Sequence, residues 1–113
     1  MMKTVLWIDD LRDPPMRADT KYMIARSVNQ AKALLELAEK DAWEDKIDYI
    51  SIDHDAGIYE PQGGDYINLL NWLEYRQHTQ NGKIYPIRIH SMNAVGCVNM
   101  RAIIERNDWE EVF

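Results

Sequence analysis

The sequence predicts an α/β domain with an open, mostly parallel sheet and helices on both faces. Short apolar runs rich in β-branched and aromatic residues alternate along the chain with segments in which apolar residues recur at helical spacing. The first run, Lys3–Ile8, is apolar from Val5 onward, which is typical of a strand buried on both faces of a parallel sheet. The chain has 113 residues, enough for one compact domain, so we expect residues 1–113 to fold as a single unit.

The first half of the chain contains two predicted strands and one predicted helix. Lys3–Ile8 forms the first strand, and Pro14 and Pro15 predict a loop rather than a helix after it. Tyr22–Arg26 is the second strand. The following Ser27-x-x-Gln30 has the form of a capping box, and the apolar spacing after it predicts a helix to about residue 40.

The second half repeats the alternation twice. A strand is expected over Tyr49–Asp53, followed by a glycine-containing loop and by a helix from about residue 65 to just before Asn81. The next strand is expected over Ile84–His90, and a last helix follows, which Asn93 can cap. The tail Trp109–Phe113 fits either an edge strand or a docked turn, and the sequence does not decide between them.

Composition and charge exclude several classes of function. Thirteen Lys and Arg against nineteen Asp and Glu give a net charge of -6, which argues against coating duplex DNA and leaves open a nucleotide or RNA end held in a local pocket. The apolar run Val5–Ile8 is too short for a membrane span. Cys97 is the single cysteine, which excludes a disulfide framework and predicts a reducing, cytoplasmic location.

Three predicted strands end in polar residues of types that carry chemistry. Because ligands of open α/β sheets bind outside the carboxyl ends of the strands, we expect these groups to converge at one edge. Taken singly, each group also fits an ordinary turn, a helix cap or a hydrogen-bonded core histidine. The three groups are Asp9 and Asp10, then Asp53, His54 and Asp55, then His90, Ser91 and Asn93.

Clustered carboxylates repel one another, so a cation or a substrate donor is expected among them. Asp9, Asp10 and Asp53 offer the oxygen ligands that hard divalent ions prefer, which favours Mg²⁺ or Mn²⁺ over Zn²⁺. Addition of His54 or His90 to the ligand set would shift the preference towards Mn²⁺, Fe²⁺ or Zn²⁺.

The two histidines suggest acid–base chemistry on a phosphate ester. His54 and His90 titrate near neutrality, and Asp55 is placed to orient one of them. Candidate phosphate-binding residues are found in the same segments, although either arginine also fits a plain ion pair and Asn93 a plain helix cap. These candidates are Arg12, Arg88, Ser91 and Asn93.

The order of these residues resembles the phosphorylation site of response-regulator receiver domains, which have a flavodoxin-like fold. The resemblance implies that Asp9 and Asp10 hold Mg²⁺, that Asp53 accepts a phosphoryl group and that Ser91 contacts it. The chain departs from that pattern after the first strand, where a Pro-Pro loop replaces a helix, and it has no clear fifth strand with a lysine. A receiver-like fold modified after the first strand is therefore expected.

A closer resemblance is to the cyclic-phosphate-processing receiver-like domain family, and it covers nearly the whole chain. It departs at Ala94, where Pro is expected at the first helical position, and at Ala56, where Leu is more usual. The resemblance implies processing of cyclic phosphates, at RNA ends or in nucleotides. The matching segments are Trp7–Pro14, Ser51–Asp55 and His90–Gly96, followed by Asn99 and Met100.

The leading hypothesis from the sequence is a metal-assisted phosphoesterase that acts on a small cyclic phosphate. Asp9, Asp10 and Asp53 would bind the metal, and His54 and His90 would transfer protons. The rival hypothesis is a signalling or nucleotide-sequestering module without turnover, and a third is a relic site whose surface serves a protein partner. The sequence leaves turnover, the substrate and the oligomeric state open.

Overall fold

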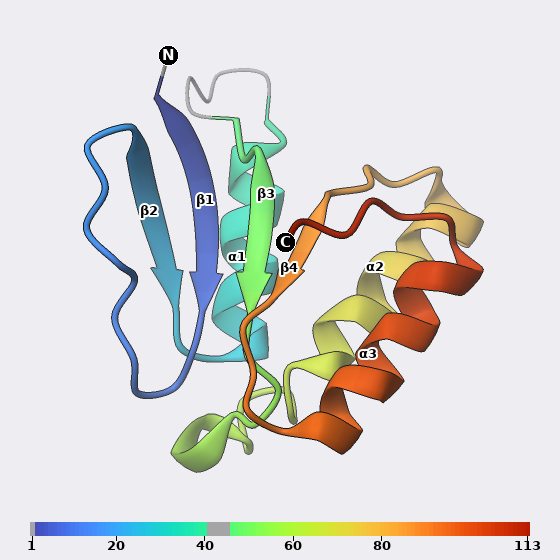
Figure 1. Ribbon diagram of the computed structural model, residues 1–113. Coiled ribbons are helices and arrows are strands. Elements are labelled where there is room, and N and C mark those ends of the chain that lie inside the picture. The colour runs from blue at the N-terminus through green and yellow to red at the C-terminus, as the bar shows by residue number, and fades with distance from the viewer. Residues whose placement is uncertain (1, 41–45) are drawn as a thin grey trace.

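The computed structural model describes residues 2–40 and 46–113, which form a four-stranded parallel sheet and three α-helices (Figure 1). The strand order is β2-β1-β3-β4, and all neighbouring pairs are parallel. The predicted α/β class with an open parallel sheet is confirmed. The strands are β1 (Lys3–Ile8), β2 (Thr20–Ala25), β3 (Tyr49–Ile52) and β4 (Ile87–Ile89), and the helices are α1 (Val28–Ala38), the 3₁₀ helix η1 (Gly57–Tyr59), α2 (Ile67–Gln80) and α3 (Ala94–Arg106).

One face of the sheet forms the hydrophobic core with the helices. The register places Leu6 of β1 beside Ile50 of β3, and Ile50 beside Ile87 of β4, and all three side chains are fully buried. Because β2–α1–β3 and β3–α2–β4 are right-handed crossovers that step in the same direction, α1 and α2 cover the same face. Residues of α3, among them Ile104, join the same core.

The opposite face is built differently from the expectation of helices on both faces. Trp7, Ser51 and Arg88 lie side by side on it in register, and Trp7 is absent from the core that the helices share. The segment between β1 and β2 contributes Pro15 to a cavity on this face. A proline-rich loop therefore replaces the helix that would otherwise follow β1, as the sequence indicated, and this face has no helical layer of its own among the described elements.

The ends of the helices follow the local signals in the sequence. Ser27 caps α1 by accepting a hydrogen bond from the backbone N–H of Gln30 at 3.0 Å. Asn81, with a left-handed φ of 54°, ends α2. Asn93 caps α3 through the backbone N–H of Gly96, and α3 begins normally at Ala94 although no proline stands there.

The last strand is shorter than expected, and the tail docks beside it. Pro86 lacks the N–H that a sheet ladder needs, and β4 begins only after it. Ile87 forms a single parallel bridge to Glu111, and the backbone N–H of Val112 donates to the carbonyl of Ile87 at 2.7 Å. The tail is thus a short docked segment on the free side of β4. Within residues 2–40 and 46–113, no helix is both long and apolar enough to cross a membrane.

Candidate functional site

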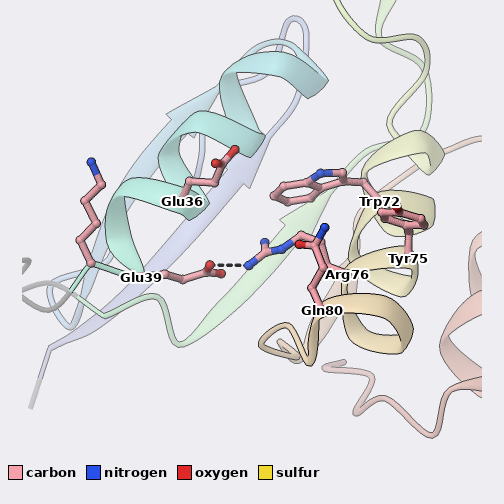
Figure 2. Close-up of a pocket in the computed structure, with 7 residues that line it drawn as sticks. Glu36, Glu39, Trp72, Tyr75, Arg76 and Gln80 are labelled. Carbon is pink, nitrogen blue, oxygen red and sulfur yellow. Dashed lines mark hydrogen bonds and ion pairs between the residues drawn. The ribbon is translucent and has the colours of Figure 1, made fainter.

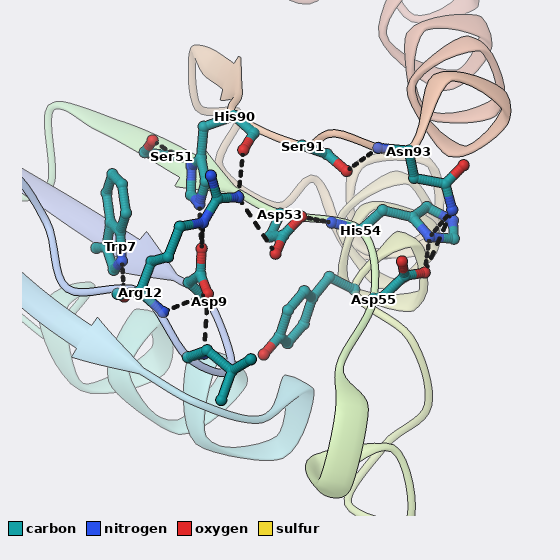
Figure 3. Close-up of polar contacts among 12 residues, drawn as sticks. Trp7, Asp9, Arg12, Ser51, Asp53, His54, Asp55, His90, Ser91 and Asn93 are labelled. Carbon is teal, nitrogen blue, oxygen red and sulfur yellow. Dashed lines mark hydrogen bonds and ion pairs between the residues drawn. The ribbon is translucent and has the colours of Figure 1, made fainter.

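The three polar strand ends converge at the carboxyl edge of the sheet, as the sequence predicted (Figure 3). Asp9 and Asp10 follow β1, Asp53 follows β3, and His90 follows β4. One carboxylate oxygen from each of the three aspartates lies within 4.8 Å of the others. This acidic cluster, Asp9, Asp10 and Asp53, is the first part of the site.

Asp9 is completely buried, and donors surround its carboxylate. Its Oδ1 accepts the backbone N–H groups of Leu11 at 2.9 Å and Arg12 at 2.8 Å. Its Oδ2 accepts Arg12 Nε at 3.2 Å and His90 Nε2 at 3.0 Å. Burial raises the pKa of Asp9, but these hydrogen bonds outweigh it and hold the pKa below its usual value. Asp9 is therefore a fixed carboxylate at the centre of the network.

Arg12 connects the loop after β1 to the other two strand ends. Its Nη2 donates to the backbone carbonyl of His90 at 2.9 Å and lies 3.6 Å from Asp53 Oδ2. Trp7 Nε1 donates to the carbonyl of Arg12 at 2.9 Å, which fixes the loop against β1. The side chain of Arg12 remains 51% exposed, so part of its guanidinium faces solvent beside the acidic cluster.

His90 is held on both ring nitrogens. Nε2 contacts Asp9, and Nδ1 lies 2.8 Å from Ser51 Oγ. The indole of Trp7 stacks on the imidazole at 4.0 Å between centroids, with the planes 6° apart. Burial is the largest influence on His90 and lowers its pKa, which favours the neutral ring. A neutral ring beside the Asp9 carboxylate donates from Nε2 to Asp9 and accepts from Ser51 at Nδ1.

His54, Asp55 and Asn93 form a second group next to the acidic cluster. His54 Nδ1 lies 2.7 Å from Asp55 Oδ1, and this hydrogen bond lowers the pKa of Asp55. Asn93 Nδ2 donates to the same carboxylate oxygen at 3.3 Å. Gly96 of α3 packs against the imidazole so closely that a Cβ there would lie 2.5 Å from two of its ring atoms. The predicted orienting role of Asp55 thus has the geometry it needs.

Asp10, the third carboxylate of the acidic cluster, lies against Gly57 of the 3₁₀ helix η1. Burial and the charges of the neighbouring carboxylates raise its pKa. Gly57, with a φ of +56°, lies against its side chain, and a Cβ at that position would be 2.3 Å from Asp10 Oδ2. The backbone of η1 therefore approaches this carboxylate as only glycine allows.

The remaining predicted residues lie in different places. Ser91 lies between the two groups, where its Oγ accepts the backbone N–H of Asn93 at 3.1 Å. Arg88 does not join the residues at the sheet edge: it lines a cavity on the helix-free face together with His90. The expectation that Arg88 and His90 share one face of β4 is therefore confirmed, whereas Arg88 lies apart from Arg12.

Comparison with known protein families supplies an independent observation. Residues 4–106, which include every candidate site residue, match the family model of the cyclic-phosphate processing receiver domain. The chain belongs to the cyclic-phosphate processing receiver domain family. No curated protein and no solved structure matches the chain.

Sequence reasoning missed several residues of this receiver domain's site. Ser51 and Trp7 contact His90 only because the sheet register places them on the face to which its ring turns. Tyr66 is buried directly before α2 and donates to the carbonyl of Arg26 at 2.7 Å. Burial and the acidic cluster raise its pKa. The alternation of side chains along β1 and β3 was a usable signal for Ser51 and Trp7, but not for Tyr66.

A larger cavity of the receiver domain lies away from this edge. It has a volume of about 360 Å³ and lies at the C-terminal ends of α1 and α2, as Figure 2 shows. Arg76 forms an ion pair with Glu39 and lies over the ring of Trp72 at 4.4 Å. None of the candidate site residues lines it. Size alone therefore does not identify the functional site here.

Proposed function

We propose that this receiver domain hydrolyses a cyclic phosphate ester at the carboxyl edge of its sheet. The observation that carries the proposal is the placement of an imidazole–carboxylate pair, His54 and Asp55, beside the cluster of three carboxylates. The family's association with cyclic-phosphate processing agrees with this chemistry. A cyclic nucleotide or the cyclic phosphate of an RNA end is the substrate class we propose.

The acidic cluster fits a hard divalent cation, with unequal roles for its members. Asp9 has its four acceptor positions filled by Leu11, Arg12 and His90, so it would serve mainly to fix the loop. Asp10 lies against Gly57, and its raised pKa indicates that its negative charge is not fully compensated within the protein. Asp53 accepts a backbone N–H from His54 at 2.8 Å through Oδ1. We therefore assign the oxygens of these two carboxylates to a cation.

Oxygen-only ligation favours Mg²⁺ or Mn²⁺ over Zn²⁺. Such a cation, when bound, would polarise a phosphoryl oxygen and offset the negative charge of the cluster. Arg12, half exposed and already 3.6 Å from Asp53, is placed to hold a second phosphoryl oxygen.

His54 is the better placed of the two histidines to act as general base. Its Nδ1–H donates to Asp55, whose lowered pKa keeps it ionised, so the lone pair of Nε2 is left to accept a proton. Water would attack phosphorus and pass a proton to His54 Nε2 while one ring P–O bond breaks. The proton then goes to the leaving oxygen, and the product is a phosphomonoester with a free hydroxyl.

His90, proposed from the sequence as the partner in proton transfer, must first give up a hydrogen bond. Both of its nitrogens are engaged, by Asp9 and Ser51, in the described structure. In the proposed reaction its main role is to position Asp9. This division between the two histidines is testable by mutation.

The decisive experiment is hydrolysis of a panel of 2′,3′- and 3′,5′-cyclic nucleotides, with Mg²⁺ or Mn²⁺ and with EDTA. We expect His54→Gln to lower kcat at least 100-fold, because general-base catalysis contributes roughly 10²–10⁴. Asp53→Asn should also lower kcat at least ~100-fold, because it removes a proposed ligand of the cation. His90→Ala should lower kcat less than His54→Gln does. His78→Gln is the matched control, because His78 bonds Asn107 near the far end of α2. Full activity in both His54→Gln and Asp53→Asn would refute the assignment of the hydrolytic site to these residues.

A second candidate function is binding of a phosphate ligand without turnover. The observation that favours it is the saturated network around Asp9 and His90, in which no ring nitrogen of His90 is left for a substrate. Recovery of an intact cyclic nucleotide after incubation with protein and metal would support binding alone. Labelling by acetyl phosphate that Asp53→Asn abolishes would support a phospho-acceptor module instead.

A further inference from the structure

A small cavity opens on the helix-free face of the sheet, next to the acidic edge but not part of it. Its volume is about 90 Å³, a quarter of that of the cavity between α1 and α2, which suits a small oxyanion better than a whole nucleoside. It is lined by Trp7, Pro15, Arg17, Tyr22, Tyr49, Ser51, Arg88 and His90.

The charge of this cavity is opposite to that of the chain. Within residues 2–40 and 46–113, two arginines, Arg17 and Arg88, line it and no Asp or Glu does. Three larger cavities each contain at least one acidic residue, although two of them also contain a lysine or an arginine. In a chain of net charge -6, a cavity with two guanidinium groups and no carboxylate is a place where an anion is attracted.

The two guanidinium groups lack partners within the part of the chain that the structure describes. Arg88, half-buried in the middle of β4, forms no hydrogen bond or ion pair there through its side chain, and neither does Arg17. The other described arginines, 12, 26, 76, 101 and 106, all pair with carboxylates. A bound oxyanion would give Arg88 and Arg17 the charge-assisted hydrogen bonds that the other five arginines make with carboxylates.

The rest of the lining suits a phosphoryl group that carries a planar substituent. Tyr22 and Tyr49, both partly exposed, also line the cavity, whereas the Ser51 hydroxyl in its lining is already bonded to His90 Nδ1. An aromatic base attached to the anion would extend over these rings, since the cavity itself holds only the anion.

We propose that this cavity is an anion site that binds the phosphoryl group of a phosphate or phosphomonoester through Arg17 and Arg88, without a metal ion. The site is separate from the proposed hydrolytic centre, to which Ser51, His90 and Asp9 connect it in one hydrogen-bonded chain. Without a metal ion the acidic cluster repels phosphate, whereas the two arginines of the cavity attract it. The proposal does not depend on hydrolysis.

The test is a binding titration in EDTA, with inorganic phosphate and with a nucleoside 3′-monophosphate as probes, followed by calorimetry and by amide NMR shifts. We expect binding with shifts at residues 17, 22, 49, 51 and 88. Arg88→Gln and Arg17→Gln should each weaken it at least 10-fold, and Arg88→Lys should weaken it less than Arg88→Gln. Arg106→Gln, on an exposed arginine paired with Glu74 near the end of α3, is the control and should bind like the wild type.

The two probes distinguish the source of the phosphoryl group. Tighter binding of the nucleotide, with shifts at both tyrosines, identifies a nucleotide site, whereas equal affinity identifies a site for free phosphate. No binding of either probe in EDTA, or equal binding by both glutamine variants with unchanged circular dichroism, overturns the proposal. Because turnover is not measured, this result is independent of the hydrolysis assay.

Discussion

Replacement of Asp9 by Asn tests whether the carboxylate at the centre of the site is also a determinant of the fold. Asn has the shape of Asp but replaces one acceptor oxygen by an NH₂ donor. Its oxygen can still accept the backbone N–H groups of Leu11 and Arg12. Its NH₂ group then faces the two other donors, Arg12 Nε and His90 Nε2.

His90 can adapt to this change and Arg12 cannot. If the proton of His90 moves to Nδ1, that nitrogen donates to Ser51 Oγ, and Nε2 accepts from the new amide. Arg12 Nε has no acceptor tautomer, so its bond to residue 9 is lost. A charge-assisted hydrogen bond contributes about 1.5–3 kcal/mol, and the two backbone bonds weaken when their acceptor becomes neutral.

Relief of repulsion acts in the other direction but is the smaller effect. Asp9 lies close to two other carboxylates, and its burial raises its pKa. The hydrogen bonds nevertheless bring the pKa below its usual value, so the fold favours the charged form. We therefore expect Asp9→Asn to lower the free energy of unfolding by about 2–4 kcal/mol, which corresponds to a fall in Tm of roughly 10 °C or more.

Urea denaturation and ¹⁵N NMR of the His90 ring are the assays. Asp19→Asn is the matched control. Asp19 is exposed, and among the described residues its carboxylate accepts only from the Thr20 hydroxyl, at 3.0 Å, so a change below about 0.5 kcal/mol is expected. If Asp9→Asn unfolds within about 0.5 kcal/mol of the wild type, or if His90 keeps its proton on Nε2, the described network is not the one that holds the site.

Three further predictions concern the acidic cluster and the imidazole beside it. Gly57→Ala would place a Cβ 2.3 Å from Asp10 Oδ2 at a left-handed φ, so Mn²⁺ should bind more weakly in a calorimetric titration; equal affinity would argue against Asp10 as a ligand. Gly96→Ala should displace the His54 ring and lower kcat for cyclic nucleotides at least 10-fold without loss of helical circular dichroism, and wild-type kcat would contradict His54 as the base. Because the pKa of Asp10 is raised, the folded metal-free protein binds more protons than the unfolded chain between pH 3.8 and the raised value, so the Asp10 contribution to stability falls as pH rises through that window. Asp10→Asn should remove this fall in urea denaturation measured across the window, and an unchanged pH slope would count against the raised pKa.

The order of the elements was predictable because it rests on local chemistry. The capping side chains of Ser27 and Asn93 act within three residues of their targets, so the starts of α1 and α3 follow from sequence neighbours alone. The helix after Ser27 stops at Ala38, two residues before the expected end, and β4 is shortened after Pro86. Such ends depend on packing, which local pattern does not record.

The candidate site was predictable as a set of strand ends but not as a network. Parallel strands bring their carboxyl ends to one edge, so Asp9, Asp53 and His90 were expected to meet there. The register of β1, β3 and β4 decides that Ser51 is a partner of His90. It also decides which ring nitrogen of His90 faces each partner. A shift of one residue would turn Ser51 to the other face.

The sequence by itself determined the α/β class, the place of the acidic cluster and the family, because these depend on periodicity, residue type and order along the chain. Only the tertiary structure decided that the helices leave one sheet face to a loop, and that Arg88 lies on that face rather than beside Arg12. It also decided that both ring nitrogens of His90 have hydrogen-bond partners, to Ser51 and Asp9, and that Nδ1 of His54 faces Asp55. These outcomes depend on which side chains meet across the sheet, and residues distant in sequence meet only when the crossovers and the register are fixed.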